Sequence, residues 1–167
     1  CSAKSYPHRQ SVYKNADLKY VPLDANGSQS ILYDIISLIK ATKKSDVVLI
    51  LGVSGCCFLP IYRLFSKKRL IINIDGLEHR REKWGKYAKA FLKFSEKMAV
   101  KHADVVVADN KGIQDYVKKE YRTETELIAY GGDHVLCDIT DVEEEILEKY
   151  GLKNISYSFS LCRIEPE

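Results

Sequence analysis

Four short and nearly unbroken apolar runs limit what this chain of 167 residues can fold into. Each run is rich in β-branched residues and stops at a glycine or a polar residue, as strands do when both faces of a parallel sheet are buried. Amphipathic helical patterns lie between the runs, so the sequence predicts βαβ units and a parallel α/β sheet with helices on both faces. The predicted strands cover residues 46–51, 70–74, 105–108 and 126–129.

The helical patterns place apolar residues at intervals of three and four. In the longest pattern Trp84, Tyr87 and Phe91 begin an apolar stripe, which we expect to face the core. Ahead of the first helix, residues 18–23 read as a short edge strand, because Pro22 has no backbone N–H to donate. The predicted helices cover residues 29–43, 84–99 and 113–121.

A shorter segment follows this α/β pattern. Residues 141–150 form an acidic helical pattern that stops at Gly151, and residues 156–162 read as a new strand. The sequence therefore predicts one domain over residues 1–153 and the first strand of another over residues 154–167. We expect a truncated piece of a longer protein, because the chain starts without methionine and stops just after a strand.

The composition is that of an ordinary globular protein. Hydrophobic residues make up 46% and charged residues 29% of the chain, and the formal net charge is +3, which indicates neither a disordered chain nor a strongly basic nucleic-acid binder. No apolar run is long enough to span a membrane, and no signal peptide is visible. The five cysteines are odd in number and include no CxxC pair, which favours reduced thiols in a cytoplasmic protein over disulfides or a zinc site.

The ends of the predicted strands should gather the functional residues. Right-handed crossovers place the carboxyl ends of successive parallel strands on one edge of the sheet, where open α/β proteins bind ligands. We therefore expect one cleft formed by the loops 52–55, 75–78, 109–112 and 130–133. The 52–55 loop is a weak phosphate cradle, because it has neither a GxGxxG pattern nor the lysine of a P-loop.

The loop richest in charge lies between Asn73 and Arg81. Two acids, a histidine and two arginines crowd the exit of a buried strand. Carboxylates there can orient hydroxyl groups or support a developing positive charge, and arginines can hold phosphate through paired hydrogen bonds. The alternative is structural: Asp75 and Gly76 make a turn, and Glu78 favours the start of the next helix through its charge.

Lysines form a stripe along the helix predicted over residues 84–99. Their spacing of three and four residues puts them on one side, and a second basic cluster lies upstream at residues 67–69. Two interpretations stay open, a solvated helix face or a surface attracted to anionic lipid headgroups. Aromatic residues do not alternate with the lysines as a nucleic-acid stacking platform requires, so no nucleic-acid partner is expected. The stripe consists of Lys86, Lys89, Lys93, Lys97 and Lys101.

Three segments taken together resemble a known family. Residues 73–89, 94–97 and 108–116 look like the N-terminal domain of bacterial rhamnosyltransferase-type glycosyltransferases, among the retaining GT-B enzymes of family 4. The resemblance implies two Rossmann-like domains facing each other across a cleft, with this chain as the acceptor-side half. It implies transfer of a sugar, such as the deoxyhexose rhamnose, from a nucleoside-diphosphate donor to a growing lipid-linked surface polysaccharide, with no metal or other cofactor. The expected location is cytoplasmic, with an anionic membrane surface on the inner face of the bacterial membrane as a further partner.

The resemblance also assigns roles to residues. Asp75 occupies the strand-end position beside the donor sugar and is the expected catalytic group, with Gly76 on the donor side. Arg163, in a segment that resembles the opening of the donor domain, would reach the donor diphosphate. The expected acceptor-binding residues are Glu78, Arg80, Arg81 and Asn110.

Departures from the family pattern leave other functions open. The Gly-rich loop that follows the first strand of such enzymes is absent, and their paired glutamates would lie beyond Glu167. We therefore expect the chain alone to be inactive. The alternatives are a non-catalytic Rossmann-like binding domain and a GT-B nucleotide-sugar epimerase, since alternation of strands and helices does not fix function.

Overall fold

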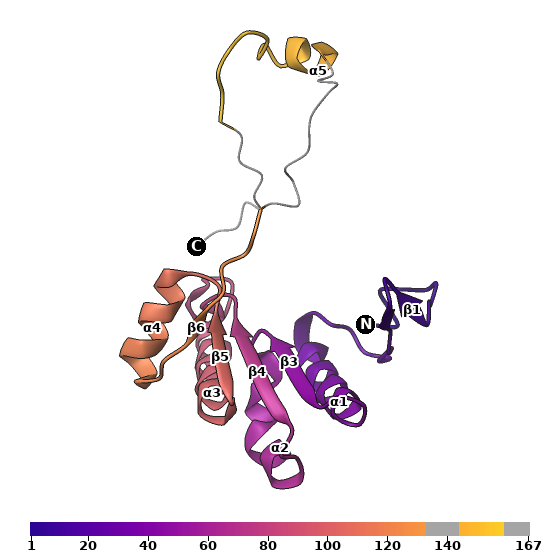
Figure 1. The fold of residues 1–167 in the computed structure, drawn as a ribbon, viewed down its shortest axis with the longest axis vertical. Helices are drawn as coiled ribbons and strands as arrows, with labels where there is room; N and C mark the ends of the chain where they lie inside the picture. The colour runs from indigo at the N-terminus through magenta and orange to yellow at the C-terminus, as the bar shows by residue number, and fades with distance from the viewer. Residues whose placement is uncertain (133–143, 159–167) are drawn as a thin grey trace. The chain divides into compact units, whose positions relative to one another are not determined.

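The computed structural model describes residues 1–132 and 144–158 of the chain. It divides the chain into two units, Cys1–Ala129 and Tyr130–Glu167 (Figure 1). The first unit holds the sheet and the helices that position the candidate site.

The second unit contains one described helix, α5 (Glu144–Lys149), within the predicted acidic pattern. Gly151 follows the helix with a φ of 65°, the left-handed conformation that glycine commonly takes after a helix end. The predicted strand over residues 156–162 falls mostly outside the described residues. The predicted boundary after residue 153 stays a prediction.

A four-stranded parallel sheet forms the centre of the first unit. Its strands lie side by side in chain order, β3-β4-β5-β6. All four predicted strands are present, and the helices that flank the sheet confirm the predicted α/β, Rossmann-like class. The strands are β3 (Val47–Leu51), β4 (Arg69–Ile74), β5 (Val105–Ala108) and β6 (Glu126–Leu127).

Helices alternate with these strands, and local sequence sets their ends. Asn110 caps the helix after β5, because its side-chain oxygen accepts a hydrogen bond from the Ile113 N–H. Pro60 lies in the first turn of the helix after β3, where a backbone N–H has no helical partner to lose. The helices are α1 (Ser30–Thr42), α2 (Leu59–Phe65), α3 (Lys86–His102) and α4 (Lys111–Tyr121), with short 3-10 helices η1 (Gly27–Gln29), η2 (Ser54–Phe58) and η3 (Glu78–Arg80).

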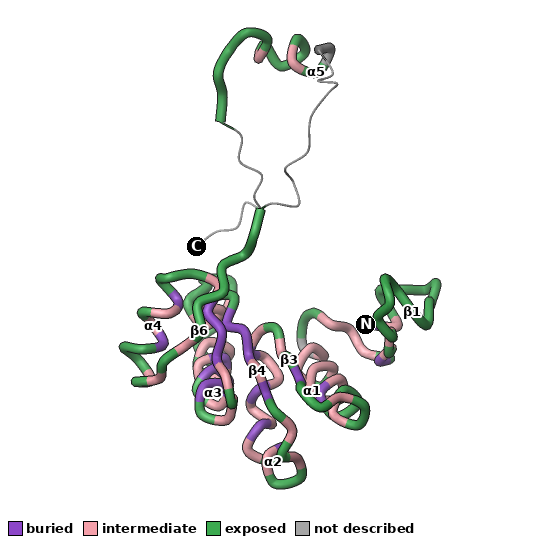
Figure 2. The backbone as a smooth tube through the Cα atoms, in the orientation of Figure 1, coloured by how far each residue is buried: buried purple, intermediate pink, exposed green. Residues whose placement is uncertain are grey.

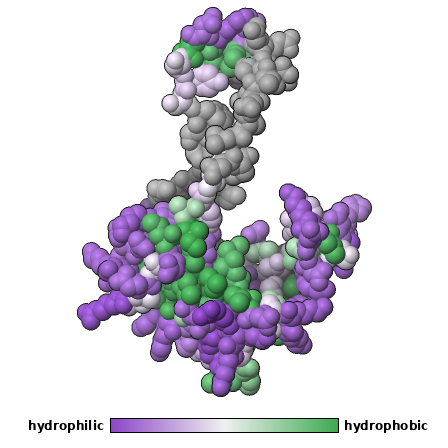
Figure 3. Space-filling view, viewed as in Figure 1, coloured by the Kyte–Doolittle hydropathy of each residue, from purple (hydrophilic) through white to green (hydrophobic). Residues whose placement is uncertain are grey.

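The core lies on one face of the sheet. Leu70, Ile72 and Ile74 alternate along β4 with no exposed surface, and they join buried residues of α1, α2, α3 and α4 (Figure 2). On the opposite face Leu49 and Leu51 of β3 are more than half exposed. Figure 3 shows apolar side chains gathered over the strands. Within the described part of the first unit, the helices thus bury one face of the sheet, whereas the sequence predicted helices on both faces.

The N-terminal segment differs from the prediction. Residues 18–23 do not form a strand, and Val21 makes only an isolated bridge with Ser2. The short strands β1 (Val12–Tyr13) and β2 (Ala16–Asp17) pair with each other instead, as a small antiparallel hairpin. Local pairing within the hairpin therefore replaces the expected edge strand.

Tyr87 corrects the predicted core of α3. Its side chain is 95% exposed, whereas the buried residues of this helix include Leu92 and Ala99. At 100° per residue, Tyr87 lies about 140° around the helix from Leu92. The predicted apolar stripe joined residues that do not share one face of the helix.

Candidate functional site

The parallel register brings three of the predicted loops to one edge of the sheet. Leu51 of β3 pairs with Asn73 of β4, and Ile74 pairs with Ala108 of β5. The residues that directly follow these strands therefore lie together at the carboxyl edge. The fourth loop starts in the second unit, and Asp133 lies outside the described residues.

The loop after β3 is fixed against α1. Gly52 has a φ of 92°, and its N–H donates to the Asn73 carbonyl oxygen at 3.1 Å. Ser54 Oγ donates a hydrogen bond to Asp34 of α1, and a Cβ on Gly55 would lie 2.4 Å from Asp34 Cβ. Burial raises the pKa of Asp34, although hydrogen bonds from Ser54 and Gly55 oppose the rise. The polar groups of this loop hold the helix and the strand together.

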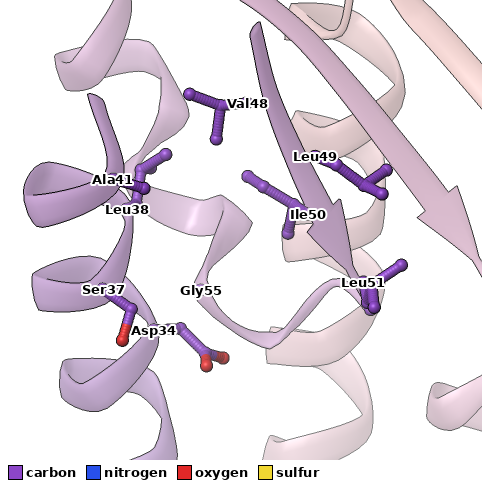
Figure 4. A pocket seen from close by; sticks show the side chains of 10 residues that line it. Asp34, Ser37, Leu38, Ala41, Val48, Leu49, Ile50, Leu51 and Gly55 are labelled. Carbon is purple, nitrogen blue, oxygen red and sulfur yellow. The ribbon is translucent and has the colours of Figure 1, made fainter. Parts of the chain in front are cut away.

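A cavity of about 200 Å³ lies between α1 and β3 (Figure 4). Asp34 and Ser37 of α1 supply its polar side chains, and the residues of β3 and Gly52 line the other wall. Pockets that enclose drug-sized ligands usually measure roughly 300 Å³ or more. The cavity is therefore too small for a nucleotide sugar, and its lining includes no residue that follows β4 or β5.

Asp75 and Gly76 leave the core at the end of β4. Ile74 is fully buried, and Asp75 is exposed directly after it. A Cβ on Gly76 would meet no atom within 4 Å, so the space beside this backbone is open. A carboxylate and an uncrowded backbone thus stand together at the carboxyl edge. Their predicted roles with the donor sugar stay predictions.

Glu78 makes two side-chain contacts within the loop that follows β4. One of its carboxylate oxygens pairs with Arg81 at 2.8 Å, and the other accepts a hydrogen bond from Trp84 Nε1 at 3.5 Å. The two contacts tie η3 to the residues that lead into α3. The predicted roles of Glu78 and Arg81 in acceptor binding stay predictions. A ligand that binds there would contact two side chains that already form an ion pair with each other.

Arg80 and His79 turn from η3 toward α4. The Arg80 guanidinium lies 4.8 Å from the centre of the Tyr116 ring, within the range of a cation–π contact. His79 Nε2 lies 3.5 Å from the Tyr116 hydroxyl. Tyr116 therefore supports both side chains, and Arg80 itself is exposed at the edge of the site.

A buried carboxylate, Glu96 of α3, lies behind this loop with only 1% of its side chain exposed. Its Oε1 accepts hydrogen bonds from the hydroxyls of Tyr116, at 2.7 Å, and Tyr121, and lies 3.4 Å from Lys93 Nζ. Its Oε2 lies 3.1 Å from His79 Nδ1, but the two atoms are not aligned for a hydrogen bond. We call His79, Lys93, Glu96, Tyr116 and Tyr121 the Glu96 cluster. It joins η3, α3 and α4.

The charges of the Glu96 cluster are balanced locally. Lys93 Nζ donates to the Tyr116 hydroxyl and pairs with Glu120 at 2.9 Å. Burial lowers the pKa of Lys93, but these hydrogen bonds and the charge of Glu96 outweigh it, so the net change is upward. Burial, with the hydrogen bonds and charge of Glu96, raises the pKa of Tyr121. Burial also raises that of Tyr116. Lys93 thus stays charged and both hydroxyls stay protonated near neutral pH.

Asn110 has a structural role at the end of β5. Its side-chain oxygen caps α4 at 2.9 Å from Ile113 N, and its Nδ2 donates to Asp109 Oδ1 at 2.8 Å. A carbonyl oxygen can accept two hydrogen bonds, so the predicted contact with an acceptor sugar is compatible with the cap and stays a prediction. Arg163, predicted to bind the donor diphosphate, lies outside the described residues.

Sequence reasoning missed the Glu96 cluster, although the sequence carried a signal for it. Glu96 is four residues after Leu92, three before Ala99 and four before Val100, all of them buried. A charged residue on the apolar side of a helix needs buried partners. Those partners are tyrosines of α4, which sequence spacing along α3 could not identify.

No metal site is found in the described part of the chain, and its most buried thiol is unreactive. No three histidine, cysteine, aspartate or glutamate side chains gather there as a metal would require. The described cysteines, Cys1, Cys56 and Cys57, are free. Burial, followed by the charges of Asp34 and Cys57, raises the pKa of Cys56 to about 12, so this thiol is a poor nucleophile. The expectation of transfer without a metal stays a prediction.

The fold and the site together define a Rossmann-like α/β domain with a charged loop at the carboxyl edge of its sheet. Over residues 1–133 the chain matches the family described as a domain of unknown function, DUF1972. The chain belongs to this family, which is found at the N-terminus of glycosyltransferase-like proteins. The chain has no match among curated proteins.

Proposed function

We propose that the chain is the acceptor-side half of a retaining GT-B glycosyltransferase. The proposed enzyme moves a sugar, such as rhamnose or another deoxyhexose, from a nucleoside-diphosphate donor to a lipid-linked saccharide. The observation that carries the proposal is the loop between Asp75 and Arg81, which stands at the carboxyl edge and contacts the buried Glu96 through His79. Membership of a family found at the N-terminus of glycosyltransferase-like proteins supports it.

On the donor side, Asp75 would act on the reacting sugar. Positive charge develops on the sugar ring as its bond to the diphosphate breaks, and a fixed carboxylate beside the ring stabilises that charge. Gly76 would leave room for the donor, because no atom lies near the position of a Cβ there. Arg163 would hold the departing diphosphate through charge-assisted hydrogen bonds. The proposed reaction uses these side chains and no metal.

On the acceptor side, the proposal uses the charged residues of η3 and the start of α4. Arg80 and Arg81 would bind the phosphate groups of a lipid-linked saccharide, since a guanidinium fork matches phosphate geometry. Glu78 and Asn110 would accept hydrogen bonds from sugar hydroxyls. Stacking of Arg80 over Tyr116 restricts its side chain, which lowers the entropy lost on binding.

Transfer should require more than this chain. We expect the 167-residue chain to give no turnover, and the complete gene product to transfer sugar, because donor and acceptor must be held together for reaction. The assay incubates each protein with radiolabelled nucleoside-diphosphate deoxyhexoses and lipid-linked saccharides and measures label in the lipid fraction. NMR of the product would then show that the anomeric configuration of the donor is retained.

Two results would contradict this proposal. One is transfer by the chain alone at the rate of the complete gene product. The other is epimerisation of the nucleotide sugar, or no reaction at all, when the complete gene product meets the whole donor and acceptor panel. Epimerisation would identify the other kind of GT-B enzyme considered above.

A further inference from the structure

The short helix α2 presents apolar side chains to solvent. Its inward side chains, Leu59 and Tyr62, are buried in the core. Leu64 and Phe65 are 78% and 84% exposed, and Ile61 is half exposed, so the apolar residues follow the helix repeat on its outer side. We call Ile61, Leu64 and Phe65 the α2 tip. Figure 3 shows an apolar projection where Figure 1 places this helix.

Basic residues surround the α2 tip. The chain runs from Phe65 through Lys67, Lys68 and Arg69 into the start of β4. The end of α1 lies alongside, because Thr42 Oγ1 donates to the Tyr62 hydroxyl at 3.1 Å. The end of α3 also lies alongside α2, because Arg63 Nε of α2 donates to the His102 carbonyl oxygen at 2.9 Å. We call the lysines and arginine at these ends the basic rim, which consists of Lys43, Lys44, Lys67, Lys68, Arg69 and Lys101.

Acidic residues at this edge are already paired. Asp46 lies 3.4 Å from Lys68, and Asp104 lies 2.8 Å from Arg63 and also accepts a hydrogen bond from Leu70 N–H. The rim therefore keeps an excess of positive charge around an apolar projection. That combination is complementary to an anionic lipid surface, into which interfacial helices insert apolar side chains while their basic residues contact headgroups.

The lysine stripe predicted on α3 is less suited to this purpose. Lys93, in its middle, is bound to Tyr116 and Glu120, and Lys89 is half-buried. Lys101 belongs to both the stripe and the basic rim. As a surface for anionic lipid, the edge where α1, α2 and α3 end is thus favoured over the side of α3.

We infer that the α2 tip and its basic rim dock the protein reversibly on anionic lipid bilayers. A protein partner fits this surface less well, because a stable interface covers about 800 Å² on each side and three side chains expose less. Docking at this edge would leave the candidate site accessible. The site follows the carboxyl end of β4, and six residues of a strand span about 20 Å.

The inference does not depend on sugar transfer and can be tested with this chain. Co-sedimentation would compare vesicles of phosphatidylcholine mixed with phosphatidylglycerol against vesicles of phosphatidylcholine alone. We expect binding to the mixed vesicles only, and weaker binding at high salt because salt screens the charges. Substituting Leu64→Ser with Phe65→Ser should weaken binding at least about tenfold, since both side chains lose their apolar contact with lipid.

Variants of the basic rim test the electrostatic part. Lys67→Gln with Arg69→Gln should weaken binding by about fivefold for each charge removed. The difference from wild type should disappear at high salt. These positions are exposed, so melting curves of all variants should match that of the wild type.

Two matched controls on α3 remove two large exposed side chains or two exposed positive charges. Tyr87→Ser with Phe94→Ser removes exposed aromatic side chains, and Lys86→Gln with Lys97→Gln removes exposed charges. Both should bind mixed vesicles as the wild type does. Three results would overturn the inference. The wild type does not bind mixed vesicles, the Leu64 and Phe65 variant binds them as well as the wild type does, or the α3 controls lose as much binding as the tip and rim variants do. Self-association in the ultracentrifuge, lost in the tip variant without any vesicle binding, would identify a second copy as the occupant instead.

Discussion

Replacing Glu96 by alanine is expected to lower the free energy of unfolding by about 3 to 6 kcal/mol, because two tyrosine hydroxyls lose hydrogen bonds to a charged acceptor. The carboxylate is 1% exposed and accepts hydrogen bonds from Tyr116 and Tyr121. Without it both hydroxyls lose their buried acceptor, and Lys93 keeps only Glu120 as an acidic partner. Urea unfolding followed by circular dichroism measures the change.

The conservative variant Glu96→Gln is the control. Its amide oxygen can still accept from both tyrosine hydroxyls, so a smaller loss of stability is expected than for alanine. Unfolding of the alanine variant at the wild-type urea midpoint would contradict a stabilising role for the cluster. It would also contradict the view that the Glu96 cluster fixes the position of η3.

The pH dependence of this effect has a defined sign. The pKa values of Lys93, Tyr116 and Tyr121 are all raised in the folded state, so the folded protein binds these protons more tightly than the unfolded chain. Their contribution is complete below the ordinary pKa values of about 10 and is lost as the pH rises through the raised ones. The stability difference between wild type and Glu96→Ala should therefore shrink in strongly alkaline solution.

In the proposed glycosyltransferase, Asp75→Asn is expected to lower the turnover number by about a hundredfold or more, as loss of one preorganised electrostatic group does. Asp75 follows Ile74 of β4, which is fully buried, and is itself exposed at the carboxyl edge. The substitution keeps size and shape and removes the charge. The KM for the acceptor should change less than the turnover number, because the proposed role is in the transition state.

A nearby carboxylate supplies the matched control for Asp75. Glu82 is exposed and lies in the stretch that joins η3 to α3, and Glu82→Gln should turn over as the wild type does. Melting curves should be unchanged for both variants, since both side chains are at the surface. Wild-type turnover in a folded Asp75→Asn protein would show that Asp75 only shapes the turn after β4.

The sheet could be predicted from sequence because its strands carry their own signal. A run such as residues 70–74 has apolar side chains on both faces, and only a parallel sheet commonly buries such a run. The predictions for Tyr87 and for residues 18–23 were wrong for local reasons. Helical spacing alone did not set which side of α3 faces the core, and a short hairpin paired residues upstream of the expected edge strand.

The candidate site could be predicted only where it follows from topology. The position of Asp75 at a strand end follows from the parallel order of the strands, since all their carboxyl ends share one edge. The Glu96 cluster depends on side chains from η3, α3 and α4, which are separated along the chain and meet only through helix packing. Lys93 illustrates the difference, because it was expected in a lysine stripe on the polar side of the helix and is bound to Tyr116 and Glu120.

The most direct test of the account is whether the carboxyl edge binds an acceptor saccharide. Amide NMR of the chain would be recorded during titration with a soluble saccharide linked through diphosphate to a short isoprenoid. We expect saturable shifts confined to the residues between Asp75 and Arg81 and to the start of α4. Arg80→Gln with Arg81→Gln should weaken this binding at least about tenfold, because hydrogen bonds to charged groups are lost. Shifts elsewhere in the chain, or none at saturating ligand, would contradict the central claim.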